Sequence, residues 1–254
     1  MTDITVPDTD KALLDKVSLR VHCNDGMYMP SGARHYLSVG LSAVRCIEKA
    51  LEKSNRTNAV GSILDFPSGY GRVLRFLKAK FPKADITASE IDTSKLDFCK
   101  DVFSVKSVIS DIDFSKLSLS GKFDLIWCGS LITHIDERAT ADLLKFFYNH
   151  LSPGGLCVFT THGQLSVKWI EQKTQTYRLT ASAQHQLLSQ FYDKGYGYAD
   201  KNQHGYGISV VSHKRMLSIA RNVGKWNEIY FQEREWDNHQ DVYGFTKNTE
   251  QGAP

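Results

Sequence analysis

A short glycine-containing segment is the first place in this chain where residue types and spacing could do chemistry. It reads Ile63-Leu64-Asp65-Phe66-Pro67-Ser68-Gly69-Tyr70-Gly71-Arg72 and begins with an apolar run typical of a buried strand. Glycines that follow a strand permit a tight turn and let a ligand approach the backbone. A plain strand-to-helix turn is the alternative, because a Gly-x-Gly alone is an imperfect signal.

Two acidic residues stand at the ends of the next two expected strands. Glu90 follows Gly69 by about 20 residues, the spacing at which a carboxylate can bind the hydroxyls of a ribose. Asp111 could accept a hydrogen bond from an adenine amino group, with Ile91 and Ile112 on the two faces of the ring. A surface carboxylate and a turn-forming aspartate are the respective alternatives. Together these residues indicate a nucleoside site.

Two histidines stand near the ends of later strands. His134 and His162 come after the fourth and fifth expected strands, at the edge where ligands bind in such sheets. Histidine titrates near neutral pH, so either one could act as a general base. The alternative for each is a capping or packing histidine. His204 and Asp136 are weaker candidates for the same role.

Alternating short strands and helices must position these residues. Apolar runs predict strands at residues 60–66, 86–89, 105–110, 123–128 and 156–161. Helical spacing predicts helices at 32–53, 70–81, 93–103 and 216–223, and one more between the N-cap Asp136 and the stop Pro153-Gly154-Gly155. Two closing strands are expected at 228–232 and 241–245. The pattern predicts an α/β fold with a doubly wound, mostly parallel sheet and helices on both faces.

Taken in order, these motifs resemble the class I S-adenosylmethionine-dependent methyltransferases. The resemblance covers about residues 59–163 and rests on Asp65-x-x-x-Gly69-x-Gly71, Glu90, Asp111, Phe123-Asp124-Leu125-Ile126-Trp127 and Leu151-x-Pro153-Gly154-Gly155. It implies a Rossmann-like sheet of seven strands, with S-adenosylmethionine as cofactor and S-adenosylhomocysteine as product. The cofactor-binding residues that it implies are Asp65, Pro67, Ser68, Gly69, Gly71, Arg72, Glu90, Ile91, Asp111, Ile112, Cys128, Gly129, Ser130 and Leu131.

One position departs from the family pattern. The first glycine of the family's loop falls at Pro67, and proline has a fixed φ and no N–H. One backbone donor to the ligand is therefore missing. Because the later glycines, Gly69 and Gly71, remain, we expect the site to be functional.

The resemblance implies methyl transfer to a small molecule, and we expect a hydroxyl of a sugar or related metabolite as the acceptor. Aligning the nucleophile with the methyl group supplies much of the rate acceleration of methyl transfer. A general base accelerates the reaction of a hydroxyl further, because it removes the proton. Tyrosines interleaved with glycines after residue 176 suit a mobile lid over a polar ligand, although they could equally pack an insertion by themselves. The expected substrate residues are Tyr28, Tyr196, Tyr198, His204 and Tyr206.

The chain is expected to divide into two parts. Residues 1–55 would be an N-terminal segment and helix that cover the cofactor pocket. Residues 56–254 would form the methyltransferase domain. Within it we expect a core at 59–163, a lid insertion at about 164–208, and a closing helix and strands at 209–247.

Composition excludes several other classes. With 254 residues, 41% of them hydrophobic and 23% charged, the chain is expected to fold. A net charge of +3 is too small for a nucleic-acid footprint, and no apolar run is long enough to span a membrane. The five cysteines form no C-x-x-C pair, which argues against a disulfide framework or a zinc site. With no visible secretory signal, a cytoplasmic location is expected. No metal is expected either, because there is no clear acidic cluster beyond Asp136-Glu137.

Two other functions compete with methyl transfer. A nicotinamide-dependent oxidoreductase is disfavoured because the third glycine of a Gly-x-Gly-x-x-Gly motif is replaced by Leu74. A scaffold that keeps the fold without catalysis is the other alternative, since fold alone does not fix function. The acceptor and the oligomeric state stay open.

Overall fold

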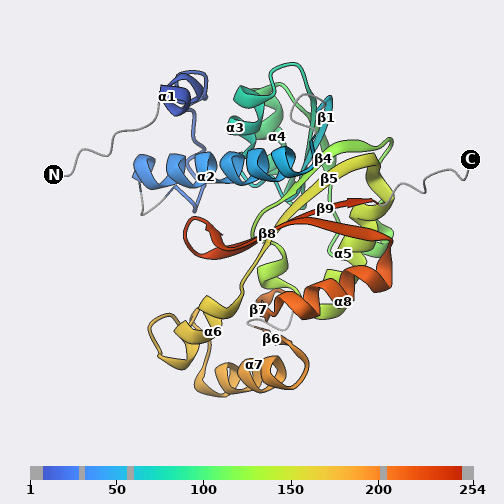
Figure 1. The fold of residues 1–254 in the computed structure, drawn as a ribbon. Coiled ribbons are helices and arrows are strands. Elements are labelled where there is room, and N and C mark those ends of the chain that lie inside the picture. The colour runs from blue at the N-terminus through green and yellow to red at the C-terminus, as the bar shows by residue number, and fades with distance from the viewer. Residues whose placement is uncertain (1–7, 29–31, 56–59, 201–204, 248–254) are drawn as a thin grey trace, which may run out of the picture.

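The structure, a computed structural model, describes residues 8–28, 32–55, 60–200 and 205–247. Within these ranges the chain forms a seven-stranded sheet in the order β3-β2-β1-β4-β5-β9-β8 (Figure 1). Its strands are β1 (Ser62–Asp65), β2 (Asp85–Glu90), β3 (Lys106–Ile109), β4 (Phe123–Cys128), β5 (Leu151–Thr161), β8 (Trp226–Trp236) and β9 (Gln240–Lys247). The first five are mutually parallel, and β9 is antiparallel to β5 and β8. The carboxyl ends of β1 to β5 therefore share one edge.

Helices cover both faces of this sheet (Figure 1). Those described are α1 (Asp8–Leu14), α2 (Gly32–Lys53), α3 (Leu74–Lys80), α4 (Thr93–Phe103), α5 (Glu137–His150), α6 (Gln164–Glu171), α7 (Ala181–Lys194) and α8 (His213–Val223). The apolar sides of α2, α3 and α4 pack on one face, and those of α5 and α8 pack on the other. None of these helices has both the length and the apolar character needed to cross a membrane. The mostly parallel, doubly wound fold is thereby confirmed.

Several element boundaries differ from the sequence-based expectation, and two of the differences have a local cause in the chain. The helix expected at 70–81 begins only at Leu74, because Gly69 and Gly71 have φ of 53° and 79° and so form a turn. The helix expected to end at Pro153-Gly154-Gly155 ends earlier, at His150, and those three residues lie within β5. There β5 carries extra residues relative to β4, a bulge that accommodates the proline and glycines.

The chain between β5 and α8 leaves the main sheet and forms a small unit of its own. It consists of α6, α7 and a hairpin of β6 (Tyr196–Asp200) and β7 (Gly207–Val211). The unit has a separate apolar core, and Figure 1 shows it below the sheet. The hairpin is fastened over the short helix η2 (Ile132–His134): the Tyr196 and Ser209 hydroxyls donate to the backbone carbonyls of Ile135 and Ile132. The hairpin thus reaches the carboxyl edge of the sheet.

Candidate functional site

A cavity of about 600 Å³ opens at the carboxyl edge of the sheet, within the size range of small-molecule sites. It is walled by the ends of β1 to β4, the first turns of α5 and the tip of the hairpin. Nine residues singled out from the sequence line it: Pro67, Glu90, Ile91, Asp111, Ile112, Ser130, Leu131, Asp136 and Tyr206. The structure therefore brings Pro67 and the ribose and adenine candidates to one cavity, whereas the loop candidates Asp65, Ser68, Gly69 and Gly71 do not line it.

Glu90 connects the glycine turn to the end of β2. Its side chain is 5% exposed, and its two carboxylate oxygens accept from the backbone N–H of Gly69 (3.0 Å) and of Ile91 (2.9 Å). Only glycine fits at position 71. A Cβ there would lie 2.4 Å from the Phe103 ring, and the backbone φ of 79° also favours glycine. At Gly69 nothing lies within 4 Å of a Cβ position, so the turn leaves open space for a ligand.

The adenine candidates lie at the outer part of the cavity. Ile91 and Ile112 are 51% and 75% exposed, which is unusual for large apolar side chains that line one cavity. The exposed Asp111 carboxylate accepts from the backbone N–H of Asp113 at 2.8 Å, so it also shapes its own turn. Two apolar side chains beside a hydrogen-bond acceptor suit a flat ring that carries an amino group.

Asp65 has a buried carboxyl group at the end of β1. Both of its carboxylate oxygens are buried and have no hydrogen-bond partner among the described residues. Burial, and then the charge of Glu90, raise the pKa of Asp65 well above its usual range. Buried carboxylates are normally paired or neutralised. Asp65 ends β1 and precedes the open turn at Gly69 in the sequence, so a ligand ammonium that reached its carboxyl group would compensate it. In that respect the residues fit a cofactor with an amino-acid end.

The segment after β4 is held by hydrogen bonds to residues of β5 and β9. Cys128 is fully buried, and burial raises the pKa of its thiol, so it belongs to the core and does not line the cavity. Ser130 has a φ of 62°, rare for a residue other than glycine. Its N–H donates to Thr160 Oγ1 at 2.9 Å, and its hydroxyl accepts from Gln240 Nε2 at 2.7 Å. Gln240, on β9, thus fixes a residue that lines the cavity.

The two candidate bases meet beside the hairpin. His134 Nδ1 lies 2.8 Å from the Gly207 carbonyl oxygen, and His162 Nδ1 lies 3.1 Å from that of Ser209. A carbonyl only accepts, so both Nδ1 atoms carry a proton and each neutral ring has its lone pair on Nε2. The two ring centroids are 6.4 Å apart. His134 also stacks at 4.5 Å on Tyr206, which lines the cavity.

A third histidine, which the sequence analysis did not single out, extends this pair. His239 stacks on His162 with centroids 4.9 Å apart, and its Nε2 lies 2.7 Å from the Tyr177 hydroxyl. Burial lowers the pKa of His239, which favours the neutral ring. Next to it, burial raises the pKa of Asp241 to about 6. No sequence pattern marks these residues, because only the antiparallel entry of β9 brings them to the end of β5.

The remaining expected substrate residues are dispersed. Tyr28 packs edge-on against Tyr36 at 5.5 Å and does not line the cavity. Tyr196 and Tyr198 line a second cavity, described next. His204 lies outside the described residues.

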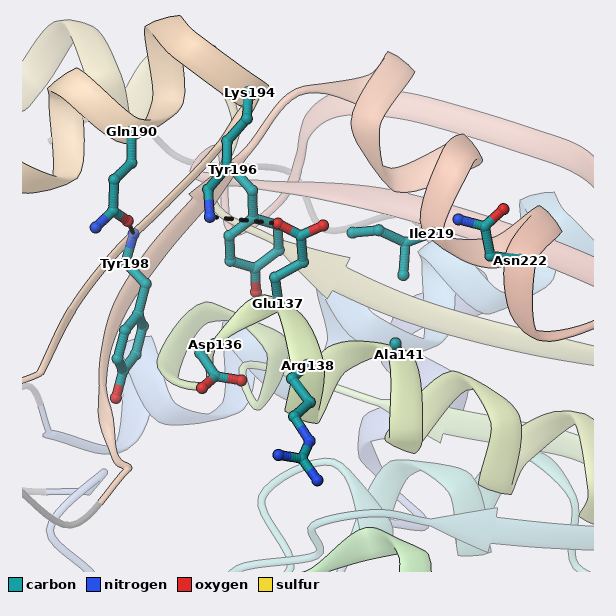
Figure 2. Close-up of a pocket in the computed structure, with 10 residues that line it drawn as sticks. All are labelled: Asp136, Glu137, Arg138, Ala141, Gln190, Lys194, Tyr196, Tyr198, Ile219 and Asn222. Carbon is teal, nitrogen blue, oxygen red and sulfur yellow. Dashed lines mark hydrogen bonds and ion pairs between the residues drawn. The ribbon is translucent and has the colours of Figure 1, made fainter.

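The second cavity, of about 530 Å³, lies beside the first turn of α5 (Figure 2). It is bounded by α5, α7, β6 and α8, and it shares Asp136 and Arg138 with the first cavity. Figure 2 shows Lys194 reaching Glu137 across its upper wall, at 3.7 Å. The buried Tyr198 hydroxyl has no hydrogen-bond partner in the described part of the chain. Its lining therefore suits a polar ligand.

A metal centre finds no support in residues 8–28, 32–55, 60–200 and 205–247. No group of three or more His, Cys, Asp or Glu side chains in these ranges could hold a metal ion.

Comparison with known proteins identifies relatives over most of the chain. A family model described as a methyltransferase domain matches residues 34–242. The malonyl-[acyl-carrier protein] O-methyltransferase of Bacillus anthracis is 25% identical over 162 residues, which are 63% of this chain and 60% of that protein. The ubiquinone/menaquinone biosynthesis C-methyltransferase UbiE of Desulfotalea psychrophila is 26% identical over 100 residues, 39% of this chain and 40% of that protein. The matches thus span less than two thirds of these relatives.

Solved structures share the fold over a larger fraction of this chain and of their own length. An S-adenosylmethionine-dependent methyltransferase from Clostridium acetobutylicum covers 89% of this chain and 96% of its own, with a TM-score of 0.57 and 16% identity. The glycopeptide N-methyltransferase MtfA, complexed with S-adenosylmethionine, covers 79% and 93%, with a TM-score of 0.53 and 17% identity. At these identities the likeness is one of fold.

Proposed function

We propose, from the premise that this chain belongs to the methyltransferase domain family, that it transfers a methyl group from S-adenosylmethionine to a hydroxyl of a small molecule. The family match over residues 34–242 supports the cofactor and the reaction class. The cofactor supplies an electrophilic methyl on a sulfonium with a good, neutral leaving group. The chain must bind the cofactor, align the acceptor and accept a proton.

The 600 Å³ cavity provides the residues for cofactor binding. Glu90 accepts hydrogen bonds from the ribose hydroxyls, and Asp111 accepts one from the adenine amino group between Ile91 and Ile112. At the other end Asp65 and the open turn at Gly69 take the ammonium of the amino-acid part. The support for this assignment is that both oxygens of the buried Asp65 carboxyl group lack a hydrogen-bond partner among the described residues, and that the turn at Gly69 leaves open space.

The observation that carries the choice of a hydroxyl acceptor is the paired imidazoles. His134 and His162 have their Nδ1–H groups held by hairpin carbonyls, so the neutral form of each ring has its lone pair on Nε2. A hydroxyl must lose its proton as it attacks, and a positioned base contributes about 10²–10⁴-fold to such a step. A carboxylate or a neutral amine can attack without a base. We assign His162 or His134 to receive the acceptor proton on Nε2.

A sugar hydroxyl is the acceptor to be tested first. The Tyr206 ring stacks beside His134, and polar side chains line the adjacent second cavity. Ring faces next to amide and hydroxyl groups suit a polyhydroxylated ring, which has C–H groups on its faces and hydroxyls on its rim. In this account residues 164–208 act as the lid over the acceptor.

The proposal is tested by measuring S-adenosylhomocysteine formation with panels of monosaccharides and nucleotide-linked sugars, alongside phenols, amines and carboxylic acids. We expect turnover with a hydroxyl acceptor, and its loss in His162→Gln or His134→Gln. Turnover confined to amines or carboxylic acids, and unchanged in both variants, would contradict the assignment.

A further inference from the structure

The Tyr198 hydroxyl in the second cavity is not explained by the fold. The Tyr198 side chain lines that cavity, and Figure 2 shows it extending from β6 on the side of Asp136. The hydroxyl oxygen is buried and has no hydrogen-bond partner among the described residues. Burial, and then the charges of Asp200 and Asp136, raise the pKa of Tyr198 to about 12, so the hydroxyl keeps its proton and can donate. A buried hydroxyl without a partner costs free energy unless a ligand or a water molecule completes it.

Two amide side chains on the cavity lining also have unused hydrogen-bonding groups. Gln190 Oε1 accepts from the backbone N–H of Tyr198 at 2.9 Å, which joins α7 to β6 beside the cavity. The Nε2 group of the same amide makes no hydrogen bond with any described residue, and neither does the side chain of Asn222 on α8. Three walls of the cavity therefore offer polar groups that the fold does not use.

The charged side chains that line the cavity balance one another. They are two carboxylates and two cations, namely Asp136, Glu137, Arg138 and Lys194. Glu137 is engaged, because it pairs with Lys194 at 3.7 Å and accepts a hydrogen bond from Arg215. Asp136 Oδ1 accepts from the backbone N–H of Ala139 at 2.8 Å, while its Oδ2 has no hydrogen-bond partner in the described part of the chain. A lining without net charge does not favour a strongly charged ligand such as a phosphate.

The hydrogen-bonding groups left open to a ligand are of both kinds. Donors remain on Tyr198 and Gln190, and an acceptor remains on Asp136. The Asn222 amide can donate and accept. A ligand hydroxyl also does both, so it can use donors and acceptors that lie side by side. The Tyr198 ring and the buried Ile219 side chain add apolar surface on which the C–H faces of a sugar ring can pack.

We propose that the second cavity binds an uncharged, polyhydroxylated group, a sugar unit. The inference rests on the proposed function, and it adds a recognition site beyond the hydroxyl that receives the methyl group. The cavity shares Asp136 and Arg138 with the 600 Å³ cavity, and Asp136 follows the candidate base His134 by two residues. A second unit of the acceptor is therefore one source of the bound group. A free sugar is the other source of the same chemistry.

The first arm of the test measures sugar binding by saturation-transfer NMR, which detects weak ligands. The complex with S-adenosylhomocysteine is titrated with the methyl glycosides of glucose, galactose and mannose, and with maltose and lactose. At least one of these sugars should bind wild type. Tyr198→Phe should weaken its binding by about 3- to 10-fold, the worth of one hydrogen bond. Asn222→Ala should weaken binding of the same sugar.

Tyr192→Phe is the matched control, because it also removes one tyrosine hydroxyl from the same part of the chain. Tyr192 lies on α7 outside the cavity lining, is exposed, and donates to Glu171 Oε1 at 2.5 Å. Sugar binding by this variant should equal that of wild type. Melting temperatures confirm that the variants are folded. Tyr198→Phe should not lower the melting temperature, because the hydroxyl that it removes has no partner among the described residues.

The second arm distinguishes the two sources of the sugar. Formation of S-adenosylhomocysteine is followed with a disaccharide and with the monosaccharide that contains the same methylated unit. If the cavity holds a unit of the acceptor, the disaccharide has the lower KM in wild type, and Tyr198→Phe reduces that advantage by about 3- to 10-fold. If a free sugar binds there, Tyr198→Phe weakens sugar binding and leaves the ratio of the two KM values as in wild type.

The inference is overturned if none of the sugars binds in a manner that depends on Tyr198. It is also overturned if glucose 1-phosphate and inorganic phosphate bind there instead and lose affinity in Arg138→Gln. In either case the proposed function stands as long as wild type binds S-adenosylmethionine and methylates another hydroxyl acceptor. If wild type methylates no hydroxyl acceptor, the proposed function fails, whereas the NMR titration still reports on the cavity by itself.

Discussion

The two halves of the carboxyl edge are built differently. In the cofactor half, formed by the ends of β1, β2 and β3, each candidate stands directly at or after its own strand, from Asp65 to Ile112. In the acceptor half, near the ends of β4 and β5, the candidates come from segments far apart in sequence. His134, His162 and His239 meet there with Tyr177. One half depends on strand order alone, and the other depends on an insertion and a returning strand.

This difference indicates which quantity, cofactor affinity or turnover, should depend on each half. In the proposed assignment Glu90 and Asp65 bind the nucleoside and amino-acid parts of the cofactor, so changes there should alter cofactor affinity. The imidazoles have fixed tautomers beside the hairpin, so changes there should alter turnover at saturating cofactor. The predictions below test that separation, in order of expected effect.

The largest effect is expected in the acceptor half. His162→Gln should lower kcat by about 10²–10⁴-fold, the contribution of a positioned base. Its Kd for S-adenosylmethionine should stay within about twofold of wild type, because His162 does not line the cofactor cavity. Steady-state kinetics together with calorimetry measure both quantities.

His134→Gln and His185→Gln complete that comparison. The variant with the larger loss identifies which of His134 and His162 is the base. His185 is exposed on α7, so its change should leave kcat unaltered. Equal and small losses in all three variants would show that no histidine removes the acceptor proton.

The next effect belongs to the cofactor half. Glu90→Ala should weaken S-adenosylmethionine binding by about 100-fold, because it removes a charged acceptor for the ribose and frees the Gly69 turn. At saturating cofactor kcat should change little. Asp111→Ala should cost less than about tenfold, since that carboxylate is exposed. A larger cost at Asp111 than at Glu90, measured by calorimetry, would reverse the assignment.

A smaller, pH-dependent effect is expected at Asp65. Burial and Glu90 raise the pKa of Asp65, so the ligand-free protein keeps this proton above the usual carboxyl value of about 3.9. A bound ammonium favours the ionised form, so binding releases a proton. Affinity for S-adenosylmethionine should therefore fall as pH is lowered below that raised pKa, by up to about tenfold per pH unit. Calorimetry across pH measures this slope.

Asp65→Asn is the matched variant for this pH dependence. Because it lacks the titrating carboxyl group, its affinity for S-adenosylmethionine should no longer fall as the pH is lowered through that pKa. Because the pKa of Asp65 is raised in the folded state, ionising it costs stability as pH increases from about 3.9 to the raised value. The ligand-free variant should thus melt at a higher temperature than wild type at neutral pH. A lower melting temperature would indicate that Asp65 has a stabilising partner.

The smallest effect is expected at Gln240, which joins β9 to the segment after β4. Gln240→Ala removes the bonds to Ser130 and Thr160. We expect kcat to fall by up to about tenfold, the worth of one hydrogen bond, with little change in cofactor Kd. Gln232→Ala, at an exposed position on β8, serves as the control. A selective loss of cofactor affinity in Gln240→Ala would assign Ser130 to the cofactor half.

The cofactor half could be located from the sequence because its signals are local. Apolar runs end in polar residues at Asp65, Glu90 and Asp111, and parallel strands bring such ends together. The start of α3 was misjudged, because apolar spacing continues through a turn that the positive φ of Gly69 and Gly71 creates.

The acceptor half could be predicted only in part. His134 and His162 follow strands and were found by that position. His239 and Gln240 were not, because β9 is antiparallel and its first residues reach this edge only through the sheet order.

The most direct test of this account is calorimetric titration of the wild-type protein with S-adenosylmethionine and S-adenosylhomocysteine, with NAD as control. The account predicts micromolar binding of both sulfur compounds and none of NAD. The affinity for S-adenosylmethionine should fall by about 100-fold with Glu90→Ala and stay within about twofold with His162→Gln. Absence of binding by either sulfur compound, or binding of NAD alone, would contradict the assignment of the 600 Å³ cavity.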